Sequence, residues 1–256
     1  MKLKLPRSAF GTYRQDENSL ATLIDSAYSL GYRLFDCAPY YQNQAAVGRL
    51  LSRYQRESVF ISTKVPGEIK RREEVRYSVL SSLKEMGLTH FDLVLLHSPC
   101  PLEELGHPRR DYSSDNIEAF NALGELKREG LISHIGVSNF SSMDLYPLLS
   151  KCPYKVEVDQ VRASVSCIDQ DLLELSLGKG IALEAYGVFN GGKAVRNEAI
   201  CRVAKEKGLK PSQALLSFLR FLGFTPIIGA ESEEELKENL PLEVSFSAEE
   251  LSLLLS

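Results

Sequence analysis

Short apolar runs alternate along the chain with longer stretches in which apolar residues recur every three or four positions. The first long stretch, Ser19–Leu30, repeats apolar residues from Leu20 onward at the spacing of an amphipathic helix. Gly31 follows it, and a glycine commonly ends a helix at this position. The run Phe91–His97 is almost continuously apolar, as expected of a strand buried on both faces of a parallel sheet. The pattern therefore predicts strands and helices in alternation.

Read along the whole chain, the pattern predicts eight strands and ten helices. The strands are expected at Ser8–Tyr13, Arg33–Asp36, Val59–Val65, Phe91–His97, His134–Val137, Val156–Gln160, Ile181–Tyr186 and Phe224–Ile228. The helices are expected at Ser19–Leu30, Ala45–Tyr54, Arg72–Met86, Asn116–Glu129, Met143–Lys151, Gln170–Leu177, Asn197–Lys207, Pro211–Leu222, Ser232–Asn239 and Ser247–Leu255. Strands that are each followed by a helix indicate an α/β fold, a closed (β/α)₈ TIM barrel. An open doubly wound sheet is the alternative, but it normally carries a Gly-x-Gly-x-x-Gly turn, which this sequence lacks.

Length and composition narrow the class of protein. The 256 residues match the roughly 250 of a typical barrel, so we expect a single domain over 1–256. No apolar run approaches the roughly 20 residues of a membrane span, and the amino-terminal segment lacks the apolar core of a signal peptide, so we expect a cytosolic protein. The net charge of −4 without a long basic run argues against nucleic acid as a partner. Five cysteines without a Cys-x-x-Cys pair predict neither a disulfide framework nor a metal site.

Reactive side chains stand where the predicted strands end. Asp36 ends the second strand and Tyr41 follows five residues later, while Lys64 and His97 lie at the ends of the third and fourth strands. Catalytic groups of barrels lie at the carboxyl ends of the strands. We therefore expect a carboxylate, a phenol, an amine and an imidazole to share one mouth of the barrel.

The motifs around these residues resemble those of the aldo-keto reductase family. They occur in the family's order and at suitable spacing between about Gly11 and Asn239. The motifs are Gly-Tyr-Arg-Leu-Phe-Asp-Cys-Ala-x-x-Tyr from Gly31 to Tyr41 with Gln44 and Gly48 beyond it, Ser-Thr-Lys at 62–64, Leu-Leu-His-Ser-Pro at 95–99 and Ile-Gly-Val-Ser-Asn-Phe at 135–140. The resemblance implies the reduction of aldehydes or ketones to alcohols, with NADPH or NADH as cofactor.

The resemblance also implies a catalytic tetrad of Asp36, Tyr41, Lys64 and His97. Tyr41 would donate the proton, and Lys64 would lower the pKa of the phenol from its ordinary value near 10. Asp36 would keep Lys64 charged and positioned, and His97 would orient the substrate carbonyl. The family spacing selects Tyr41, which leaves its neighbour Tyr40 as a wall of the site.

Further residues match the family's cofactor and substrate contacts. The resemblance implies that a carboxamide is bound by Ser138, Asn139 and Gln160, and that the ring of Tyr186 stacks on the nicotinamide. Contacts with the cofactor are also implied for Thr12, Asp36, Glu238 and Asn239, the last two at the adenine, while Tyr13 and His97 would contact the substrate. The cations that usually hold the 2′-phosphate of NADPH are missing, because their positions are occupied by Gly229, Ala230 and Glu235. We therefore expect unusual tolerance of NADH.

The sequence also departs from the family. The sixth strand carries Asp-Gln-Val-Arg at 159–162, the segment after the seventh is Tyr-Gly-Val-Phe at 186–189, and the amino-terminal hairpin and the carboxyl-terminal loop are short. Because of these departures, an alternative remains open: the protein could be a cofactor-binding regulatory subunit with little catalysis. A lyase or aldolase that forms a Schiff base on Lys64 is a further alternative. Small aldehydes or open-chain aldoses are the expected substrates, and a monomer is the family default.

Overall fold

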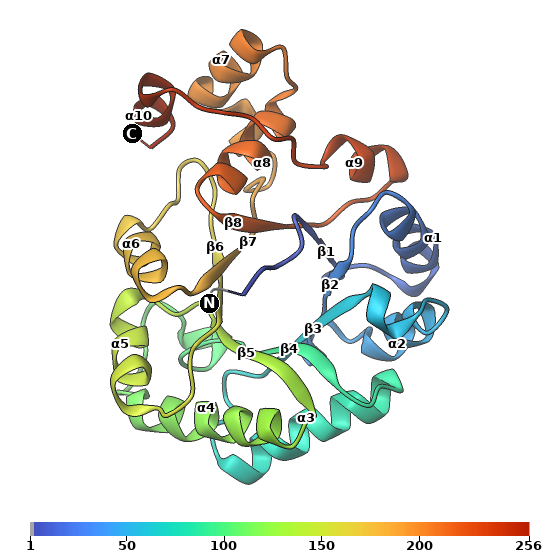
Figure 1. Ribbon diagram of the computed structural model, residues 1–256, viewed down its shortest axis with the longest axis vertical. Helices are drawn as coiled ribbons and strands as arrows, with labels where there is room; N and C mark the ends of the chain where they lie inside the picture. The colour runs from blue at the N-terminus through green and yellow to red at the C-terminus, as the bar shows by residue number, and fades with distance from the viewer. Residues whose placement is uncertain (1–2, 256) are drawn as a thin grey trace.

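The computed structural model describes residues 3–255 and forms a closed barrel of eight parallel strands in chain order (Figure 1). The barrel closes where β8 pairs with β1, with Ala9 beside Ile227. The strands are β1 (Ala9–Gly11), β2 (Leu34–Asp36), β3 (Phe60–Val65), β4 (Phe91–Leu96), β5 (Ile132–Ser138), β6 (Val158–Arg162), β7 (Ala182–Tyr186) and β8 (Phe224–Ile228). The predicted (β/α)₈ fold is confirmed.

Helices surround the barrel on the outside (Figure 1). They are α1 (Glu17–Ser29), α2 (Gln44–Leu51), α3 (Arg72–Met86), α4 (Ser113–Arg128), α5 (Ser142–Lys151), α6 (Gln170–Lys179), α7 (Glu198–Lys207), α8 (Pro211–Phe221), α9 (Glu233–Glu238) and α10 (Ala248–Leu255). Four short 3₁₀ turns join them: η1 (Pro39–Tyr41), η2 (Arg56–Ser58), η3 (Leu102–Glu104) and η4 (Ala194–Arg196). The predicted helices agree within three residues at either end.

Strand β6 begins and ends two residues later in the chain than predicted. The prediction ended this strand at Gln160, but the strand continues to Arg162 because Arg162 pairs with Tyr186 on β7. A charged residue is accommodated there because the strand has reached the open end of the barrel, where Arg162 is exposed.

Local sequence signals explain where several helices begin and end. The side chain of Asp16 accepts hydrogen bonds from the backbone N–H groups of Asn18 and Ser19, both at 2.9 Å, and so caps α1. Gly87 ends α3 in the left-handed conformation, with φ of 67°, which glycine adopts without steric cost. Such signals lie in neighbouring residues, which is why the helices could be predicted.

The side chains inside the barrel change from apolar to polar along its axis. Side chains alternate between the inside and the helix-facing side of each strand. Toward the amino ends of the strands the inside is filled by apolar side chains, a cluster that includes Leu93, Leu95, Val158 and Ala182. At the next inward positions along β6 and β7 stand Gln160 and Glu184, which are paired in register. Polar groups are therefore concentrated at the carboxyl-terminal mouth.

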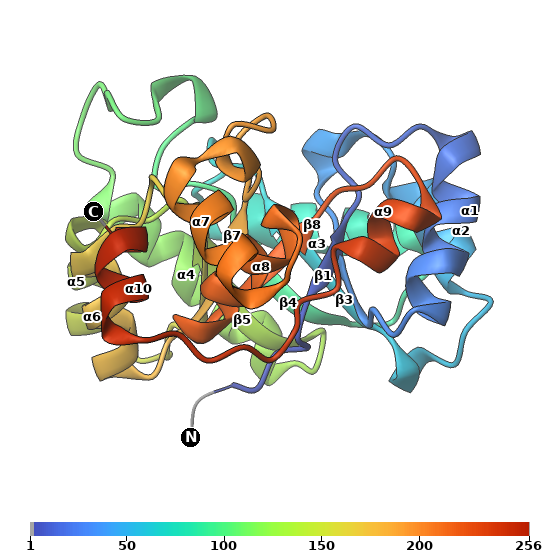
Figure 2. The same cartoon turned by 90° about the horizontal axis from the view of Figure 1, so that it is seen from above.

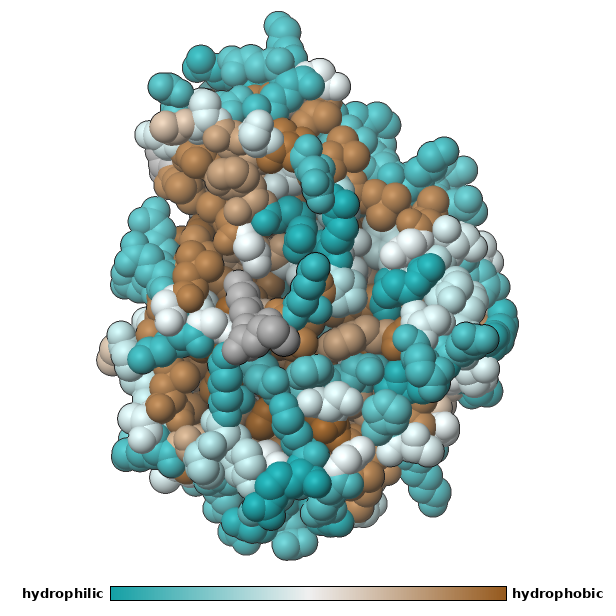
Figure 3. Space-filling view, in the orientation of Figure 1, coloured by the Kyte–Doolittle hydropathy of each residue, from teal (hydrophilic) through white to brown (hydrophobic). Residues whose placement is uncertain are grey.

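The two ends of the barrel differ in their covering. Figure 2 shows the amino-terminal segment at one end and the long loop between β4 and α4 at the opposite end. Figure 3 shows polar side chains over most of the face viewed in Figure 1, with apolar side chains gathered toward its left. Within residues 3–255, no helix has the length and apolar character needed to cross a membrane.

Candidate active site

A buried ammonium links a carboxylate to a phenol at the mouth of the barrel. Nζ of Lys64 lies 2.6 Å from Oδ1 of Asp36 and 3.0 Å from the hydroxyl oxygen of Tyr41. The Tyr41 hydroxyl also lies 3.3 Å from Oδ2 of Asp36. The turn η1, which begins with Pro39, directly follows the loop after β2 and brings the Tyr41 ring back over the strand end. The structure thus brings together three residues that the sequence predicted as neighbours.

Burial controls the electrostatics of this group. Burial opposes the charge on Lys64, but Asp36 and Tyr41 together raise its pKa above the ordinary lysine value, so the amine is an ammonium. For Tyr41, burial and then the charge of Asp36 raise the pKa, while Lys64 lowers it less. Lys64 thus acts in the expected direction, but the net pKa of Tyr41 is raised and not lowered. The reason is desolvation, which disfavours a phenolate in a buried site.

His97 directly follows β4 at the same mouth. It is only 8% exposed, and its Nδ1 has no hydrogen-bond partner among the described residues. Burial and the nearby charge of Lys64 lower the pKa of His97 to about 3. Its ring stands edge-on to that of Tyr41, with centroids 6.4 Å apart. The imidazole is therefore neutral at physiological pH and lies beside the phenol.

Two further tyrosines flank this pair of rings. The ring of Tyr13 lies 5.1 Å from that of Tyr41, and the ring of Tyr40 lies 6.2 Å from that of His97. Tyr40 is 60% exposed, and the contacts with Lys64 and Asp36 belong to Tyr41. The arrangement fits Tyr40 as a wall of the mouth.

A second polar group occupies the ends of β5, β6 and β7. Nδ2 of Asn139 donates to the carbonyl oxygen of His97 at 2.9 Å, and Oδ1 of Asn139 accepts from the Tyr186 hydroxyl at 2.6 Å. The Ser138 hydroxyl donates to the backbone carbonyl of Gln160 at 2.8 Å. Asn139 has a φ of 62°, a left-handed conformation in which asparagine is enriched. The four residues therefore lie together, as the motifs predicted.

The remaining predicted cofactor residues have different surroundings. Thr12 is fully buried, and its hydroxyl donates to the backbone carbonyl of Asp36 at 2.9 Å. Glu238 ends α9, where its carboxylate binds Lys210 and Ser212, and Asn239 follows it as a buried cap residue. Helix α9 lies outside the barrel (Figure 1), so the last two residues are apart from the tetrad.

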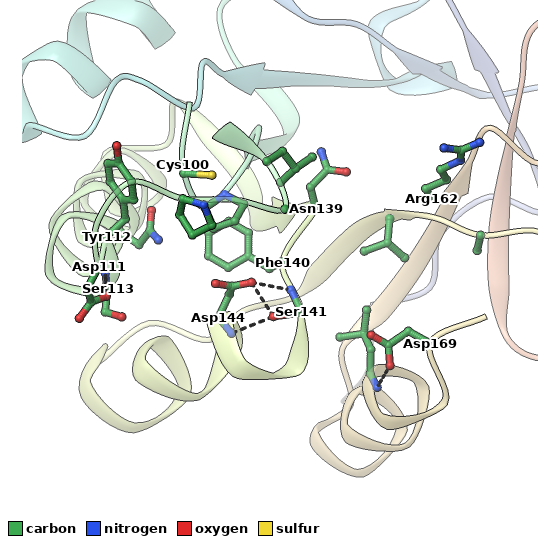
Figure 4. A pocket seen from close by; sticks show the side chains of 18 of the residues that line it. Cys100, Asp111, Tyr112, Ser113, Asn139, Phe140, Ser141, Asp144, Arg162 and Asp169 are labelled. Carbon is green, nitrogen blue, oxygen red and sulfur yellow. Dashed lines mark hydrogen bonds between the residues drawn. The ribbon is translucent and has the colours of Figure 1, made fainter. Parts of the chain in front are cut away.

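A cavity of about 650 Å³ opens beside the tetrad. The loop between β4 and α4 contributes Tyr112 on one side, and Arg162 stands at the other side (Figure 4). Asn139 and Tyr186 also line it, whereas the tetrad residues do not. The cavity thus adjoins the second polar group.

Among residues 3–255, no cluster of three or more His, Cys, Asp or Glu side chains is suited to a metal ion.

Two residues of this mouth were not predicted from the sequence. The Ser62 hydroxyl lies 3.2 Å from Oδ1 of Asp36, and Glu184 is fully buried and hydrogen-bonded to Gln160. The signal for Glu184 was its position, because a single acid interrupts the apolar run from Ile181 to Ala185 in a buried strand. A buried acid requires a partner, and the structure supplies one on the neighbouring strand, the side-chain amide of Gln160.

Known proteins with similar sequences and folds match almost the whole chain. A family model described as the aldo/keto reductase family matches residues 7–255. The chain is 29% identical over 246 residues to methylglyoxal reductase DkgB of Escherichia coli O157:H7, covering 93% of this chain and 87% of the relative. It is 30% identical over 260 residues to aldehyde reductase YPR1 of Saccharomyces cerevisiae, covering 93% and 83%.

Solved structures agree with the fold. An aldo-keto reductase of Bombyx mori, crystallised in complex with NADP, superposes with a TM-score of 0.87 at 24% identity, covering 98% of this chain and 88% of that chain. Because the family model covers nearly all of the barrel and its strand-end motifs, the resemblance read from the sequence is confirmed. The chain belongs to the aldo/keto reductase family of oxidoreductases.

Proposed function

We propose that this protein reduces aldehydes or ketones to alcohols with NADPH or NADH, and that Tyr41 is the proton donor. The observation that carries the proposal is the position of the Tyr41 hydroxyl, 3.0 Å from the buried ammonium of Lys64 and next to the neutral ring of His97. Relatives named for methylglyoxal and aldehyde reduction support carbonyl reduction in general.

The tetrad residues have separate tasks in this mechanism. Tyr41 carries its proton at neutral pH, because burial and Asp36 raise its pKa, and it gives that proton to the carbonyl oxygen as negative charge develops there. Lys64 stabilises the phenolate that remains, because its ammonium hydrogen-bonds the same oxygen. Asp36 holds Lys64 in place. His97, being neutral, orients the carbonyl by hydrogen bonding without adding charge.

The second polar group fits a nicotinamide cofactor by the chemistry of its donors and acceptors. A bound NADPH or NADH supplies hydride to the carbonyl carbon. The side-chain amide of Asn139 and the hydroxyl of Ser138 offer both donors and acceptors, as a carboxamide requires, and Gln160 offers its amide oxygen as an acceptor. The half-buried ring of Tyr186 lies against Asn139 and provides a flat surface for stacking. Thr12, Glu238 and Asn239 remain proposed contacts for the rest of the dinucleotide.

The surroundings of Tyr41 are partly aromatic. Tyr13 and His97 flank Tyr41, so we assign them to substrate contact. Small aldehydes, such as methylglyoxal, and open-chain aldoses are the proposed substrates. A monomeric, cytosolic enzyme is proposed. Size-exclusion chromatography with light scattering tests whether it is a monomer.

Steady-state turnover with methylglyoxal and a short aldose, each with NADPH and with NADH, tests the proposal. Oxidation of the reduced cofactor that depends on the carbonyl substrate is the expected result. Tight cofactor binding without turnover would instead support a regulatory subunit. Trapping of a substrate adduct on Lys64 by borohydride would support the Schiff-base alternative. The raised pKa of Lys64 disfavours that alternative, because a nucleophilic lysine must be neutral.

A further inference from the structure

A fully buried glutamate lies behind the catalytic tetrad. Glu184 on β7 is 0% exposed and is paired in register with Gln160 on β6. Both residues occupy inward positions of their strands, because Gln160 also reaches Asp36 across the barrel. The tetrad assigned above does not include Glu184.

Gln160 connects this glutamate to the tetrad. Nε2 of Gln160 donates to Oε2 of Glu184 at 2.7 Å and to Oδ1 of Asp36 at 2.9 Å. The two N–H groups of one amide are thereby directed at two carboxyl groups, which leaves the amide oxygen of Gln160 as an acceptor. The orientation of Gln160 is therefore set by Glu184 and Asp36 together.

The charge balance of this cluster favours a protonated Glu184. The cluster contains one ammonium, Lys64, which already pairs with Asp36 at 2.6 Å. Oε1 of Glu184 is buried without a hydrogen-bond partner, so an ionised Glu184 would be poorly solvated. Burial and then the charge of Asp36 raise the pKa of Glu184 to about 7, against smaller opposing effects of Gln160 and Lys64.

The groups facing Glu184 from neighbouring strands do not add a second cation. Asp36 on β2 and Lys64 on β3 act on it. On β8 its register partner is the neutral Thr225. On β6 the other buried carboxyl, Asp159, is in register with Leu183 and lies on the opposite side of the strand from Gln160, and burial raises the pKa of Asp159 well above its ordinary value.

We propose that Glu184 is a positioning residue for carbonyl reduction: protonated, it holds Gln160 against Asp36, and its ionisation at higher pH slows reduction. This inference rests on the proposed function. An added negative charge beside Asp36 and Lys64 strengthens the hold of Lys64 on its proton and raises the pKa of Tyr41 further. Tyr41 then becomes a poorer proton donor.

Measuring kcat/KM against pH from 5.5 to 9 in the wild type, Glu184→Gln and Asp159→Asn tests the proposal. In the wild type, kcat/KM should fall with an apparent pKa near 7, by up to roughly tenfold at pH 8 relative to the acidic plateau, the limit for a single ionisation to an inactive form. Glu184→Gln, which imitates the protonated acid, should stay within about twofold of its plateau over that interval. Asp159→Asn changes the other buried acid, which lies on β6, and kcat/KM of this variant should fall near pH 7 as it does in the wild type.

Infrared difference spectra between pH 5.5 and 9 give a second measurement that does not depend on turnover. A protonated-carboxyl band that titrates near pH 7 in the wild type and is missing in Glu184→Gln supports the proposal. If kcat/KM of Glu184→Gln still falls near pH 7, or if the wild type lacks such a band, the proposal is overturned and the proposed function is left intact. Absence of carbonyl turnover in the wild type overturns both.

Discussion

The hydroxyl oxygen of Tyr41 lies 3.0 Å from Nζ of Lys64; Tyr41 belongs to the turn η1 after β2, and Lys64 lies near the end of the neighbouring strand β3. Lys64 is buried and charged, so it acts on the phenol through a medium that screens little. Its effect is nevertheless smaller than that of desolvation, and the resting phenol remains protonated. The ammonium therefore matters most when the phenolate forms during the reaction.

Replacement of Tyr41 by Phe should abolish most carbonyl reduction while cofactor affinity stays nearly unchanged. Only the hydroxyl is removed, and general acid catalysis typically contributes about 10² to 10⁴-fold. Steady-state kcat and fluorescence titration with the cofactor measure the two quantities. Tyr40→Phe is the matched control, because the Tyr40 ring stands against His97 and is exposed. Near-normal kcat in Tyr41→Phe together with inactivity of Tyr40→Phe would reverse the assignment.

Replacement of Lys64 by Met should impair turnover and shift its pH profile. The phenol then loses a neighbouring charge that lowers its pKa, so the phenolate is less stable. Removing Lys64 also leaves Asp36 buried without its ion-pair partner, which typically costs about 3–5 kcal/mol of stability. Thermal unfolding must therefore accompany measurement of kcat/KM against pH. A folded variant with unchanged rate and profile would remove Lys64 from the mechanism.

The preference for NADPH over NADH should be below about a hundredfold, which corresponds to roughly 2.7 kcal/mol. Three acids, Glu233, Glu234 and Glu235, occupy the first turn of α9, where a 2′-phosphate would meet like charge. The Ser232 hydroxyl already caps the helix through the backbone N–H of Glu235. Steady-state kinetics with both cofactors measure the ratio. A larger preference would show that a phosphate-binding group exists elsewhere.

Glu157 should stabilise the amino-terminal end of the barrel in a pH-dependent way. Its carboxylate binds Lys127 at 2.5 Å, His134 at 2.9 Å and the backbone N–H of Ile135 at 3.1 Å. Burial opposes the charge, but these bonds lower the pKa of Glu157 to about 2. A depressed carboxyl pKa contributes stability that is present above the ordinary value of 4.5 and is lost as pH falls through 2.

Glu157→Gln should therefore lower the free energy of unfolding at pH 7 by about 1–3 kcal/mol, and the difference should shrink between pH 4.5 and pH 2. Urea unfolding at several pH values measures it. Glu129→Gln is the control, since Glu129 pairs with Arg76 at the surface, where ion pairs contribute roughly 0–1 kcal/mol. Equal effects of both variants at pH 7 would contradict the prediction.

Gly48→Ala should destabilise the fold because α2 and α3 touch at Gly48. A Cβ added there would lie 2.3 Å from the carbonyl oxygen of Met86, and such overpacking costs typically about 1–3 kcal/mol. Gly178, near the end of α6, has open space around it, so Gly178→Ala should be neutral or stabilise by roughly 0.5–1 kcal/mol. Melting temperatures compare the two, and a stable Gly48→Ala protein would refute the close approach.

The order of strands and helices was predictable from the sequence because it depends on neighbouring residues. Apolar spacing separates strands from helices, and signals such as Asp16 and Gly87 act within one helical turn. The residues of the tetrad could be predicted because parallel strands direct their carboxyl ends to one mouth and because the resemblance to the aldo-keto reductase family selects Tyr41 by its spacing from Asp36. The sequence by itself thus determined the barrel and the four residues Asp36, Tyr41, Lys64 and His97 as candidates.

Only the tertiary structure decided the electrostatics of that mouth. The contact between Gln160 and Asp36 joins residues 124 positions apart, and Glu184 reaches the same cluster from a further strand. The sign of the pKa change of Tyr41 depends on how completely the ring is desolvated and on the distances to Asp36 and Lys64. The burial of side chains and the distances between charged groups are set when distant strands close into a barrel. Local sequence patterns therefore do not predict them.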